Sequence, residues 1–365
     1  MNLLFQGWRR GHYKVTGGVI DEAILRGHRV TLIHGKAGKA GEGVTTDELH
    51  ARWPKADILS GHGNTLHAHA IIGDPSVGDA CSFGAPPTVP VYALDFIWEQ
   101  RMRPRVPGVT RCWATERHQS QFAWLNAASP WGNDCHLYSR VDSTVTDPVI
   151  GMPALDAIPL VDPAAVRKKY HLGTKPIVLL FSLKLGVPHL WRKTVFKYWW
   201  YPEMLYAIKD YCQKRGALLV VKTRVKHADS SIVHAVADRV ITDEALWPYT
   251  SAELVRVADL AIHFQSGAVF EAAAAGIPQL SIRVPQPHLE HFPGHAVFFS
   301  HEPHTLQHWP GVVQSIDYRE AARLLRDFPP EWKIYEWERQ RYLDRYTGPI
   351  GTSSSRVLDL IESRA

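Results

Sequence analysis

The sequence predicts an α/β protein built from two doubly wound domains, each a parallel sheet covered by helices. Short apolar runs alternate with stretches of helical periodicity in both halves of the chain, as in parallel sheets. The 365 residues are enough for about two domains. A stretch with five prolines, from Thr146 to Pro176, separates the halves. Two such domains are expected to face each other across a cleft at the carboxyl ends of their strands, where ligands bind.

In the first half we expect one helix, Val15–Leu25, which Gly27 ends. The strands expected there are Asn2–Gln6, Arg29–His34, Asp57–Ser60, Val89–Ala93 and Arg111–Thr115. The second half repeats the scheme with strands Ile177–Ser182, Ala217–Lys222, Arg239–Ile241, Leu260–Phe264 and Gln279–Arg283. Its helices are Tyr201–Arg215, Ser251–Val257 and Val269–Ala275, and a short helix covers Pro163–Tyr170. The predicted domains are therefore 1–150 and 177–340, joined by a linker at 151–176 and followed by a C-terminal helix at 341–365.

Composition excludes several classes of protein. Hydrophobic residues make up 45% and charged residues 21% of the chain, which argues against a disordered, collagen-like or coiled-coil protein. No apolar run approaches the roughly 18–20 residues that cross a bilayer, and the first residues do not form a secretory signal. The four cysteines form no C-x-x-C pair, so we expect a reducing, cytoplasmic location.

The net charge of +5 is mildly basic and falls short of a nucleic-acid footprint, so no nucleic acid is expected as a partner. It suits an acidic ligand, such as a nucleotide diphosphate or an anionic membrane surface. The segment Leu190–Tyr201 mixes cations with aromatic residues. It fits either peripheral contact with the inner face of a membrane or packing inside the second domain, and packing is slightly favoured.

The segment from Asp259 to Pro278 carries the strongest signal. It reads as a strand, a turn of small residues, an alanine-rich helix, and a Gly-x-Pro that leads into another strand. Ser266 and Gly267 place backbone N–H groups at the start of the helix, where anions bind. Glu271, about one turn later, is placed to accept hydrogen bonds from both hydroxyls of a ribose. An ordinary crossover with a buried helix explains the same pattern equally well.

This segment resembles the donor-nucleotide motif of GT-B glycosyltransferases, through Ser266-Gly267, Glu271 and Gly276-Ile277-Pro278. It is especially similar to the N-acetylglucosaminyltransferase of peptidoglycan synthesis and to UDP-N-acetylglucosamine 2-epimerases. The resemblance implies two Rossmann-type domains, a turn that faces the diphosphate of a nucleotide sugar, and a glutamate that binds the ribose. The gap between Ser266 and Glu271 is shorter than in those two families, which leaves the phosphate donor open.

A second resemblance involves Gly151-Met152-Pro153-Ala154-Leu155-Asp156. This stretch is similar to the interdomain G-x-P-x-x-D segment of the epimerases and of CDP-glycerol glycerophosphotransferase-like enzymes. The tail Gly351–Val357 is also similar to the tail of the latter group. We favour a structural role for the tail, in which its serines cap the last helix.

Basic side chains follow two strands of the second half. Lys184 comes after the first strand, and Lys222 and Arg224 come at the end of the second. In a doubly wound sheet these positions face the ligand, so the three cations are candidates to neutralise a diphosphate leaving group; solvated surface charge is the alternative. With no convincing D-x-D element and no histidine pair at ligand spacing, we expect no metal and no other cofactor.

The first half supplies the candidate catalytic bases. The loop Gly7–His12 follows the first strand, and GT-B enzymes have a similar glycine-rich loop that often carries a histidine. We expect His12 to be the general base that takes a proton from an acceptor hydroxyl, although a lone histidine in a loop is more often a surface group. Asp95 and Glu116, near the ends of later strands, are rival candidates.

Two polar loops complete the predicted site. By position in GT-B enzymes, Gln286, His288 and Glu290 correspond to residues that contact the donor sugar. The histidine-containing stretch Gly61–His69 lacks a carboxylate or cysteine at ligand spacing. It therefore reads as a loop that hydrogen-bonds sugar or acceptor hydroxyls rather than as a metal site.

Together these observations predict a metal-independent GT-B-type glycosyltransferase. It would move a sugar from a nucleotide-activated donor to a hydroxyl of a saccharide or lipid-linked acceptor, in surface polysaccharide or glycolipid assembly, with domain closure around the substrates. One alternative is a nucleotide-sugar 2-epimerase, although the H-x-E-A-G-type segment of those enzymes is missing. The others are a CDP-glycerol glycerophosphotransferase-like enzyme and a non-enzymatic nucleotide-sugar-binding protein.

Overall fold

The chain folds into two compact units, which a computed structural model describes. Unit 1 contains residues 1–159, 245–249 and 344–365, and unit 2 contains residues 160–244 and 250–343. Within them, the described residues are 1–7, 9–35, 43–60, 68–73, 89–95, 109–116, 148–183, 200–223, 231–284, 300–327 and 334–365.

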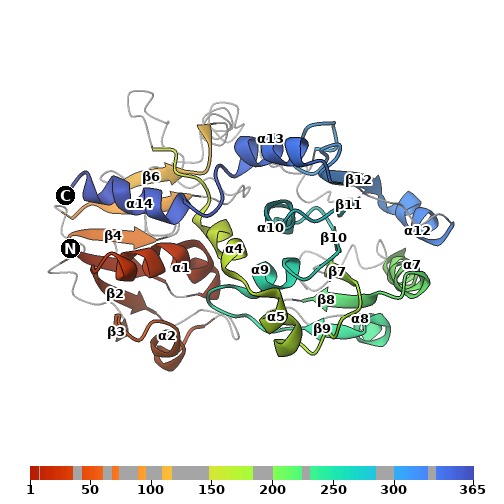
Figure 1. The fold of residues 1–365 in the computed structure, drawn as a ribbon, viewed down its shortest axis with the longest axis horizontal. Coiled ribbons are helices and arrows are strands. Elements are labelled where there is room, and N and C mark those ends of the chain that lie inside the picture. Colours follow the sequence, from red (N-terminus) through yellow and green to blue (C-terminus); the bar gives the residue numbers. More distant parts are fainter. Residues whose placement is uncertain are drawn as a thin grey trace, which may run out of the picture. The chain divides into compact units, whose positions relative to one another are not determined.

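Unit 1 contains a parallel sheet with strand order β3-β2-β1-β4-β5-β6 (Figure 1). Its strands are β1 (Asn2–Gln6), β2 (Arg29–His34), β3 (Asp57–Ser60), β4 (Ala70–Gly73), β5 (Val91–Asp95) and β6 (Val109–Trp113). Val149 adds a single parallel bridge to Trp113 at the end of β6. In β1 the run from Leu3 to Phe5 is buried throughout, as expected for a parallel strand that is covered on both faces.

The helices of unit 1 come from both ends of the chain. They are α1 (Arg10–Leu25), α2 (Thr46–Arg52), the short turns η2 (Pro153–Asp156) and α4 (Ala157–Leu160), and α14 (Ser353–Glu362). The last residue of α4 already belongs to unit 2. A capping box between Thr45 and Glu48 starts α2 and satisfies two backbone N–H groups at the start of the helix.

A distant segment, Ala245–Tyr249, packs on α1. The indole ring of Trp247 lies against two consecutive glycines: a Cβ on Gly17 would come within 2.6 Å of the ring, and one on Gly18 within 3.0 Å. Arg52 holds the segment from α2, since its Nε donates to the carbonyl of Trp247 at 2.6 Å. The two glycines are therefore required by close packing rather than by their backbone conformation.

The helix α14 is fixed at its N-terminus by a residue from η2. The carboxylate of Asp156 accepts hydrogen bonds from the backbone N–H groups of Gly351 and Ser354, both at 2.7 Å. Burial raises the pKa of Asp156, and these N–H donors oppose that rise. The preceding residue, Thr352, makes no side-chain cap. The expectation that the serines of the tail cap this helix was therefore wrong, because a buried carboxylate from elsewhere in the chain takes that place.

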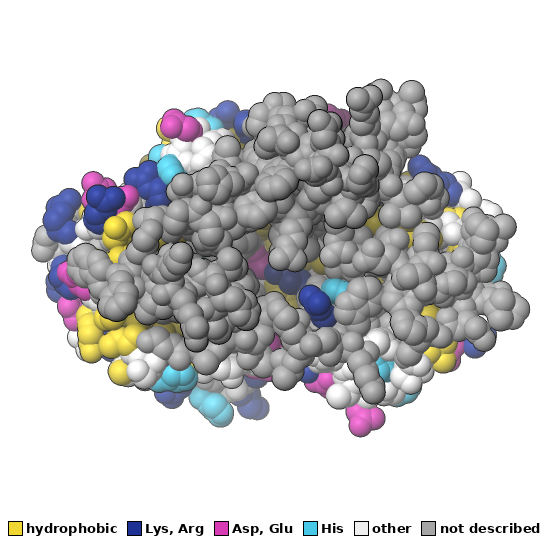
Figure 2. Space-filling view, turned by 180° about the vertical axis from the view of Figure 1, so that it is seen from behind, with side chains coloured by type: hydrophobic (Ala, Val, Ile, Leu, Met, Phe, Trp, Pro, Cys, Tyr) yellow, Lys and Arg dark blue, Asp and Glu magenta, His cyan; other side chains and the backbone are white. Residues whose placement is uncertain are grey.

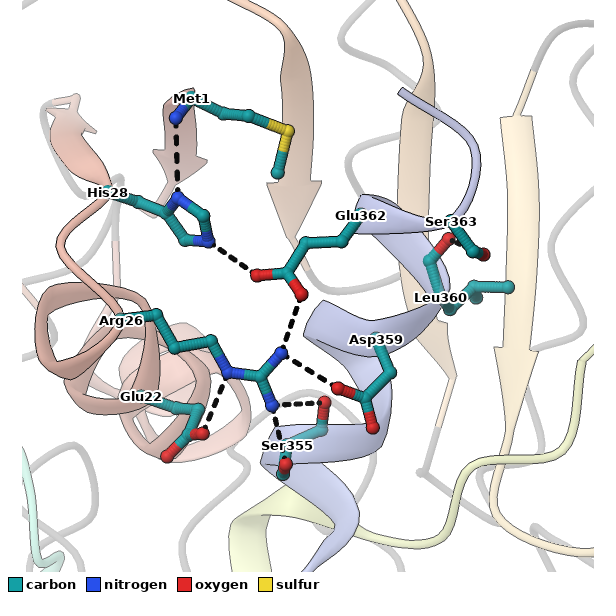
Figure 3. A network of polar contacts seen from close by, with 9 residues as sticks. All are labelled: Met1, Glu22, Arg26, His28, Ser355, Asp359, Leu360, Glu362 and Ser363. Carbon is teal, nitrogen blue, oxygen red and sulfur yellow. Dashed lines mark hydrogen bonds and ion pairs between the residues drawn. The ribbon is translucent and has the colours of Figure 1, made fainter.

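The other end of α14 is tied to α1 by a polar network (Figure 3). Arg26, just after α1, forms ion pairs with Glu22, Asp359 and Glu362 at 2.7–2.9 Å. Nε2 of His28 donates to the carboxylate of Glu362 at 2.7 Å. The side chain of Arg26 is 21% exposed but that of Asp359 is 62% exposed, so salt screens the pair between them as it does other surface pairs.

Unit 2 contains a second parallel sheet, with strand order β12-β11-β10-β7-β8-β9 (Figure 1). Its strands are β7 (Ile177–Phe181), β8 (Leu218–Lys222), β9 (Arg239–Ile241), β10 (Leu260–His263), β11 (Gln279–Arg283) and β12 (Val313–Asp317). Numbered from the first strand of each unit, both sheets have the order 3-2-1-4-5-6. In both, the direction in which strands are added reverses between the first and the fourth strand, which is where ligands bind in doubly wound sheets.

Helices cover both faces of the sheet in unit 2. They are α5 (Pro163–Lys169), α7 (Trp200–Lys214), α8 (Ser231–Val236), α9 (Thr250–Val255), α10 (Ala268–Ala275), α12 (Tyr318–Asp327) and α13 (Glu336–Tyr346), the last ending in unit 1. One face of the sheet is apolar, and Leu180, Ile262 and Leu280 on it pack in one core with α7 and α12. The other face carries polar side chains, and α10 packs there.

The predicted elements agree closely with the observed ones. Five strands, including Arg29–His34 and Gln279–Arg283, have the predicted bounds. The strands predicted at Val89–Ala93 and Arg111–Thr115 lie two residues away, at β5 and β6. Two strands, β4 and β12, were not predicted. The predicted linker 151–176 contains η2, α4 and α5, and the stretch 341–365 contains the end of α13 and all of α14.

Candidate functional site

The turn between β10 and α10 lies at the reversal point of the sheet in unit 2. β10 is the fourth strand of that sheet and pairs with the first strand, β7, on one side and with β11 on the other. The turn that follows contains Ser266 and Gly267, and the helix begins at Ala268. The residues that the sequence predicts for the diphosphate therefore stand at the edge of the sheet where a ligand is expected.

The backbone of this turn leaves one donor open. The hydroxyl of Ser266 accepts the N–H of Ala268 at 3.3 Å, and the carbonyl of Ser266 accepts the N–H of Val269 at 3.2 Å. Within the described part of the chain, the N–H of Gly267 donates to no protein acceptor. A Cβ on Gly267 would meet no atom of the described residues within 4 Å. An anion therefore has both room and a donor at the positive end of the α10 dipole.

The turn itself is built by side chains behind it. The N–H of Ser266 donates to Nδ1 of His263 at 3.4 Å. Gln265 has a left-handed backbone, with φ of 47°, and its Oε1 accepts the N–H of Val284 at 3.2 Å. The turn is thus connected to the end of β11 as well as to β10.

Glu271 lies in the first turn of α10 and is only 3% exposed. A carboxylate in this position is stabilised by the positive end of the helix dipole. Its place, one turn beyond Gly267, is the one predicted for a residue that binds a ribose.

The C-terminus of α10 is capped from another helix. Gly276 has the left-handed conformation, with φ of 72°, that ends many helices. Arg339 of α13 donates to the carbonyls of Ala273 at 2.6 Å and Ala274 at 2.8 Å. A cation on the last carbonyls complements the negative end of the dipole, so both ends of this eight-residue helix are held by polar contacts.

Lys222, predicted to neutralise a diphosphate, ends β8 as expected. It is 7% exposed, and its Nζ donates to the carbonyl of Thr223 at 2.6 Å and to Glu244 at 3.1 Å. The ammonium group is therefore already paired with a carboxylate. The other residues predicted for the phosphates and the sugar lie outside the described residues; they are Lys184, Arg224, Gln286, His288 and Glu290.

The three candidate bases lie in unit 1. His12 is not in a loop as expected: α1 begins at Arg10, so His12 stands in its first turn and is 8% exposed. Asp95 is the last residue of β5, and its side chain is not among those described. Glu116 follows β6 and is exposed. Asp95 and Glu116 follow the neighbouring strands β5 and β6, whereas His12 follows β1, which β4 separates from β5. Arg10, near His12, pairs with Glu48.

Sequence reasoning did not identify the residues that support the turn. His263, Gln279 and Ser281 are polar, yet each is at most 1% exposed. Burial lowers the pKa of His263 to about 4, against a weaker effect of its hydrogen bond to Gln279, so this histidine is neutral at pH 7. The available signals were the alternation of Gln279 and Ser281 with apolar residues in β11 and the histidine that ends the apolar run of β10.

Among the described residues, no group of three His, Cys, Asp or Glu side chains is placed to hold a metal ion. No helix in the described ranges is long and apolar enough to cross a membrane. On the face drawn in Figure 2, the Lys and Arg side chains of the described residues are interspersed with Asp and Glu.

Comparison with known proteins gives matches among solved structures alone, since no protein-family model and no curated protein sequence matches the chain. The UDP-GlcNAc 2-epimerase of Neisseria meningitidis, bound to UDP-GlcNAc, matches with a TM-score of 0.57 and 14% identity over 100% of both chains. MnaA of S. aureus, in a structure with UDP, matches with a TM-score of 0.57 and 14% identity over 100% of this chain and 96% of that one.

A third match is the wall teichoic acid polymerase TagF, in a structure with CDPG. Its TM-score is 0.58 at 12% identity, over 100% of this chain and 88% of that one. At such low identities these matches concern the fold. Together with two parallel sheets of the same strand order, they show that the chain has the GT-B-like fold.

Proposed function

We propose that this protein is an enzyme that uses a nucleotide-activated sugar, and that unit 2 binds the nucleotide at the N-terminus of α10. The observation that carries the proposal is the turn at Gly267. It combines an open backbone donor, free space at Cα and a buried glutamate one turn later, at the reversal point of a doubly wound sheet. In this arrangement Gly267 faces the diphosphate and Glu271 binds the ribose hydroxyls.

The reaction we propose is transfer of the sugar to an acceptor hydroxyl of a saccharide or lipid-linked substrate. Structures with UDP-GlcNAc, with UDP and with CDPG are among those that share the fold, which supports a nucleotide ligand. The helix dipole and the backbone donor would stabilise the departing phosphate. His12, with Asp95 and Glu116 as rivals, would take the proton of the acceptor hydroxyl. No metal is part of the proposal, so activity should survive EDTA.

Calorimetric titration with UDP, CDP, CMP, GDP and dTDP tests the nucleotide site. We expect one of them to bind selectively and Glu271→Ala to weaken it about tenfold or more, which is about 1.4 kcal/mol. The matched control is Glu320→Ala, because Glu320 is also in the first turn of a helix of unit 2 but is exposed. Equal binding by wild type and Glu271→Ala would remove Glu271 from the site, and no binding of any nucleotide would contradict the proposal.

Measurements of transfer activity distinguish the three candidate bases. We expect His12→Asn to lower kcat by about 100-fold or more, because general bases contribute roughly 10²–10⁴-fold, and to leave nucleotide affinity unchanged. Asp95→Asn and Glu116→Gln serve as parallel variants. If one of them, rather than His12→Asn, abolishes transfer, the base is that residue. Conversion of the nucleotide sugar without any acceptor would instead indicate an epimerase.

A further inference from the structure

A polar layer lies between the sheet of unit 2 and α10. Ile262 of β10 and Leu280 of β11 belong to the apolar core on one face of the sheet. Because successive side chains in a strand alternate between the two faces, the adjacent residues His263 and Gln279 lie on the other face, where both are buried. Gln279 reaches α10 directly, since its Nε2 donates to the carbonyl of Val269 at 3.2 Å. Polar side chains in this fully buried position lower stability unless they are hydrogen-bonded.

The hydrogen bonds form a chain that runs from the turn into the sheet and back to the helix. Ser266 N–H donates to Nδ1 of His263, so the proton of the neutral ring is on Nε2. Nε2 then donates to Oε1 of Gln279 at 3.3 Å, and the amide of Gln279 completes the path to Val269 in the first turn of α10. Both the turn and the start of the helix are therefore fixed to β10 and β11.

A second buried polar pair on the same face provides a comparison. Ser281 of β11 is beside His263 in the sheet register and donates to Gln307 at 2.9 Å, with both side chains fully buried. This pair is as buried as the His263–Gln279 pair and also includes a glutamine, but among the described residues it makes no hydrogen bond to the turn. Removal of the Ser281–Gln307 pair therefore shows what the loss of a buried polar pair does to stability when the turn is not involved.

We infer that His263 is a positioning residue for the nucleotide site, in which the neutral imidazole accepts the N–H of Ser266 and so leaves the N–H of Gly267 as the open donor for a phosphate. This inference rests on the proposed function. An apolar side chain at this position would leave the partly buried N–H of Ser266 without this acceptor, and a protonated imidazole would place a second donor against it. In either case the turn must rearrange, and the donor at Gly267 moves with it.

The test compares three substitutions by backbone hydrogen exchange and by nucleotide titration. His263→Leu removes the acceptor, and His263→Asn restores one through its amide oxygen. Ser281→Ala removes the comparison pair. We expect His263→Leu to speed exchange in the peptide 264–270 and to weaken the nucleotide that wild type binds, each by about tenfold, the effect of one lost hydrogen bond. His263→Asn should recover most of both effects.

Ser281→Ala should lower the Tm and change neither exchange at the turn nor affinity. Unchanged exchange in His263→Leu, or an equal change in Ser281→Ala, would overturn the inference. If wild type binds no nucleotide, the proposed function fails, and the exchange comparison still decides whether His263 holds the turn. Should His263→Leu not fold, Gln279→Leu takes its place, because it removes the partner of Nε2 and the bond to Val269; unchanged exchange there also counts against the inference.

Discussion

His263 is a histidine that folding keeps neutral. Its ring is fully buried, and burial lowers its pKa to about 4 from an ordinary value of 6.5. The uncharged ring can accept a backbone N–H at Nδ1 and donate at Nε2 at the same time. A surface histidine would gain a proton and lose that acceptor under mildly acidic conditions.

The first prediction concerns stability and pH. The pKa of His263 is lower in the folded than in the unfolded protein. The contribution of the neutral ring to the free energy of unfolding is therefore complete above pH 6.5 and is lost as the pH falls from 6.5 toward 4. Between pH 7.5 and 5, we expect the free energy of unfolding to fall by about 2 kcal/mol more in wild type than in His263→Asn. Urea unfolding at the two pH values measures this difference. An identical pH dependence in both proteins would show that the pKa of His263 is the same in the folded and the unfolded protein.

At the scale of single elements, the helices α10 and α14 differ in the polar contacts at their N-termini. At the N-terminus of α10 the N–H of Gly267 donates to no acceptor among the described residues, whereas the C-terminus is held by Arg339. The N-terminus of α14 is closed instead by the carboxylate of Asp156. An open N-terminus is where a helix can bind an anion, and a closed one serves stability.

The second prediction compares two helix caps. Asp156 is itself buried and uses both carboxylate oxygens, one on the buried N–H of Ser354 and one on the N–H of Gly351. Asp156→Asn replaces one acceptor with a donor, and we expect a loss of about 1–3 kcal/mol in the free energy of unfolding. Asp162 caps the exposed N-terminus of α5 with one hydrogen bond, to Ala164 at 2.9 Å. Because Asn caps helices about as well as Asp, Asp162→Asn should change stability by less than about 0.5 kcal/mol. Equal effects of the two changes in urea unfolding would mean that Asp156 does not hold α14.

At the scale of the whole molecule, unit 1 is assembled from three separate parts of the chain. Residues 245–249 and 344–365 belong to it although unit 2 supplies the sequence between them. The first of these parts brings Trp247 onto Gly17 and Gly18 of α1. The N-terminal 159 residues therefore do not contain all of the packing of their own unit.

The third prediction tests that packing. Gly17→Ala places a methyl group 2.6 Å from a rigid indole ring, so the ring or the helix must shift, at a cost of about 1–3 kcal/mol. In Gly11→Ala, in the same helix, the new methyl group meets no atom within 4 Å in the part of the chain that the structure describes. This change should be neutral or stabilising by up to about 1 kcal/mol, because alanine restricts the unfolded chain. Thermal or urea unfolding of both variants provides the measurement, and a neutral Gly17→Ala would be inconsistent with the contact to Trp247.

The predicted elements depended on local signals, and their success followed the strength of those signals. Continuous apolar strands such as β7 and the helix ended by Gly276 were found because burial on both faces and glycine termination leave marks in a few adjacent residues. β4, Ala70–Gly73, was missed although it is as long as β3, which was predicted; it directly follows the histidine-containing stretch that was interpreted as a loop. β12 was missed because exposed Gln314 interrupts its apolar pattern.

The sequence by itself determined the α/β class, most strand positions and the turn from Ser266 to Glu271, because each depends on neighbouring residues in the chain. The tertiary structure alone decided what surrounds that turn: His263 and Gln279 behind it and Arg339 at the far end of α10. It also decided that Lys222 is paired with Glu244, that His12 lies in a helix, and that Asp156 caps a helix almost two hundred residues away. These contacts join residues that are distant in sequence, and only the folded chain brings their side chains within hydrogen-bonding distance.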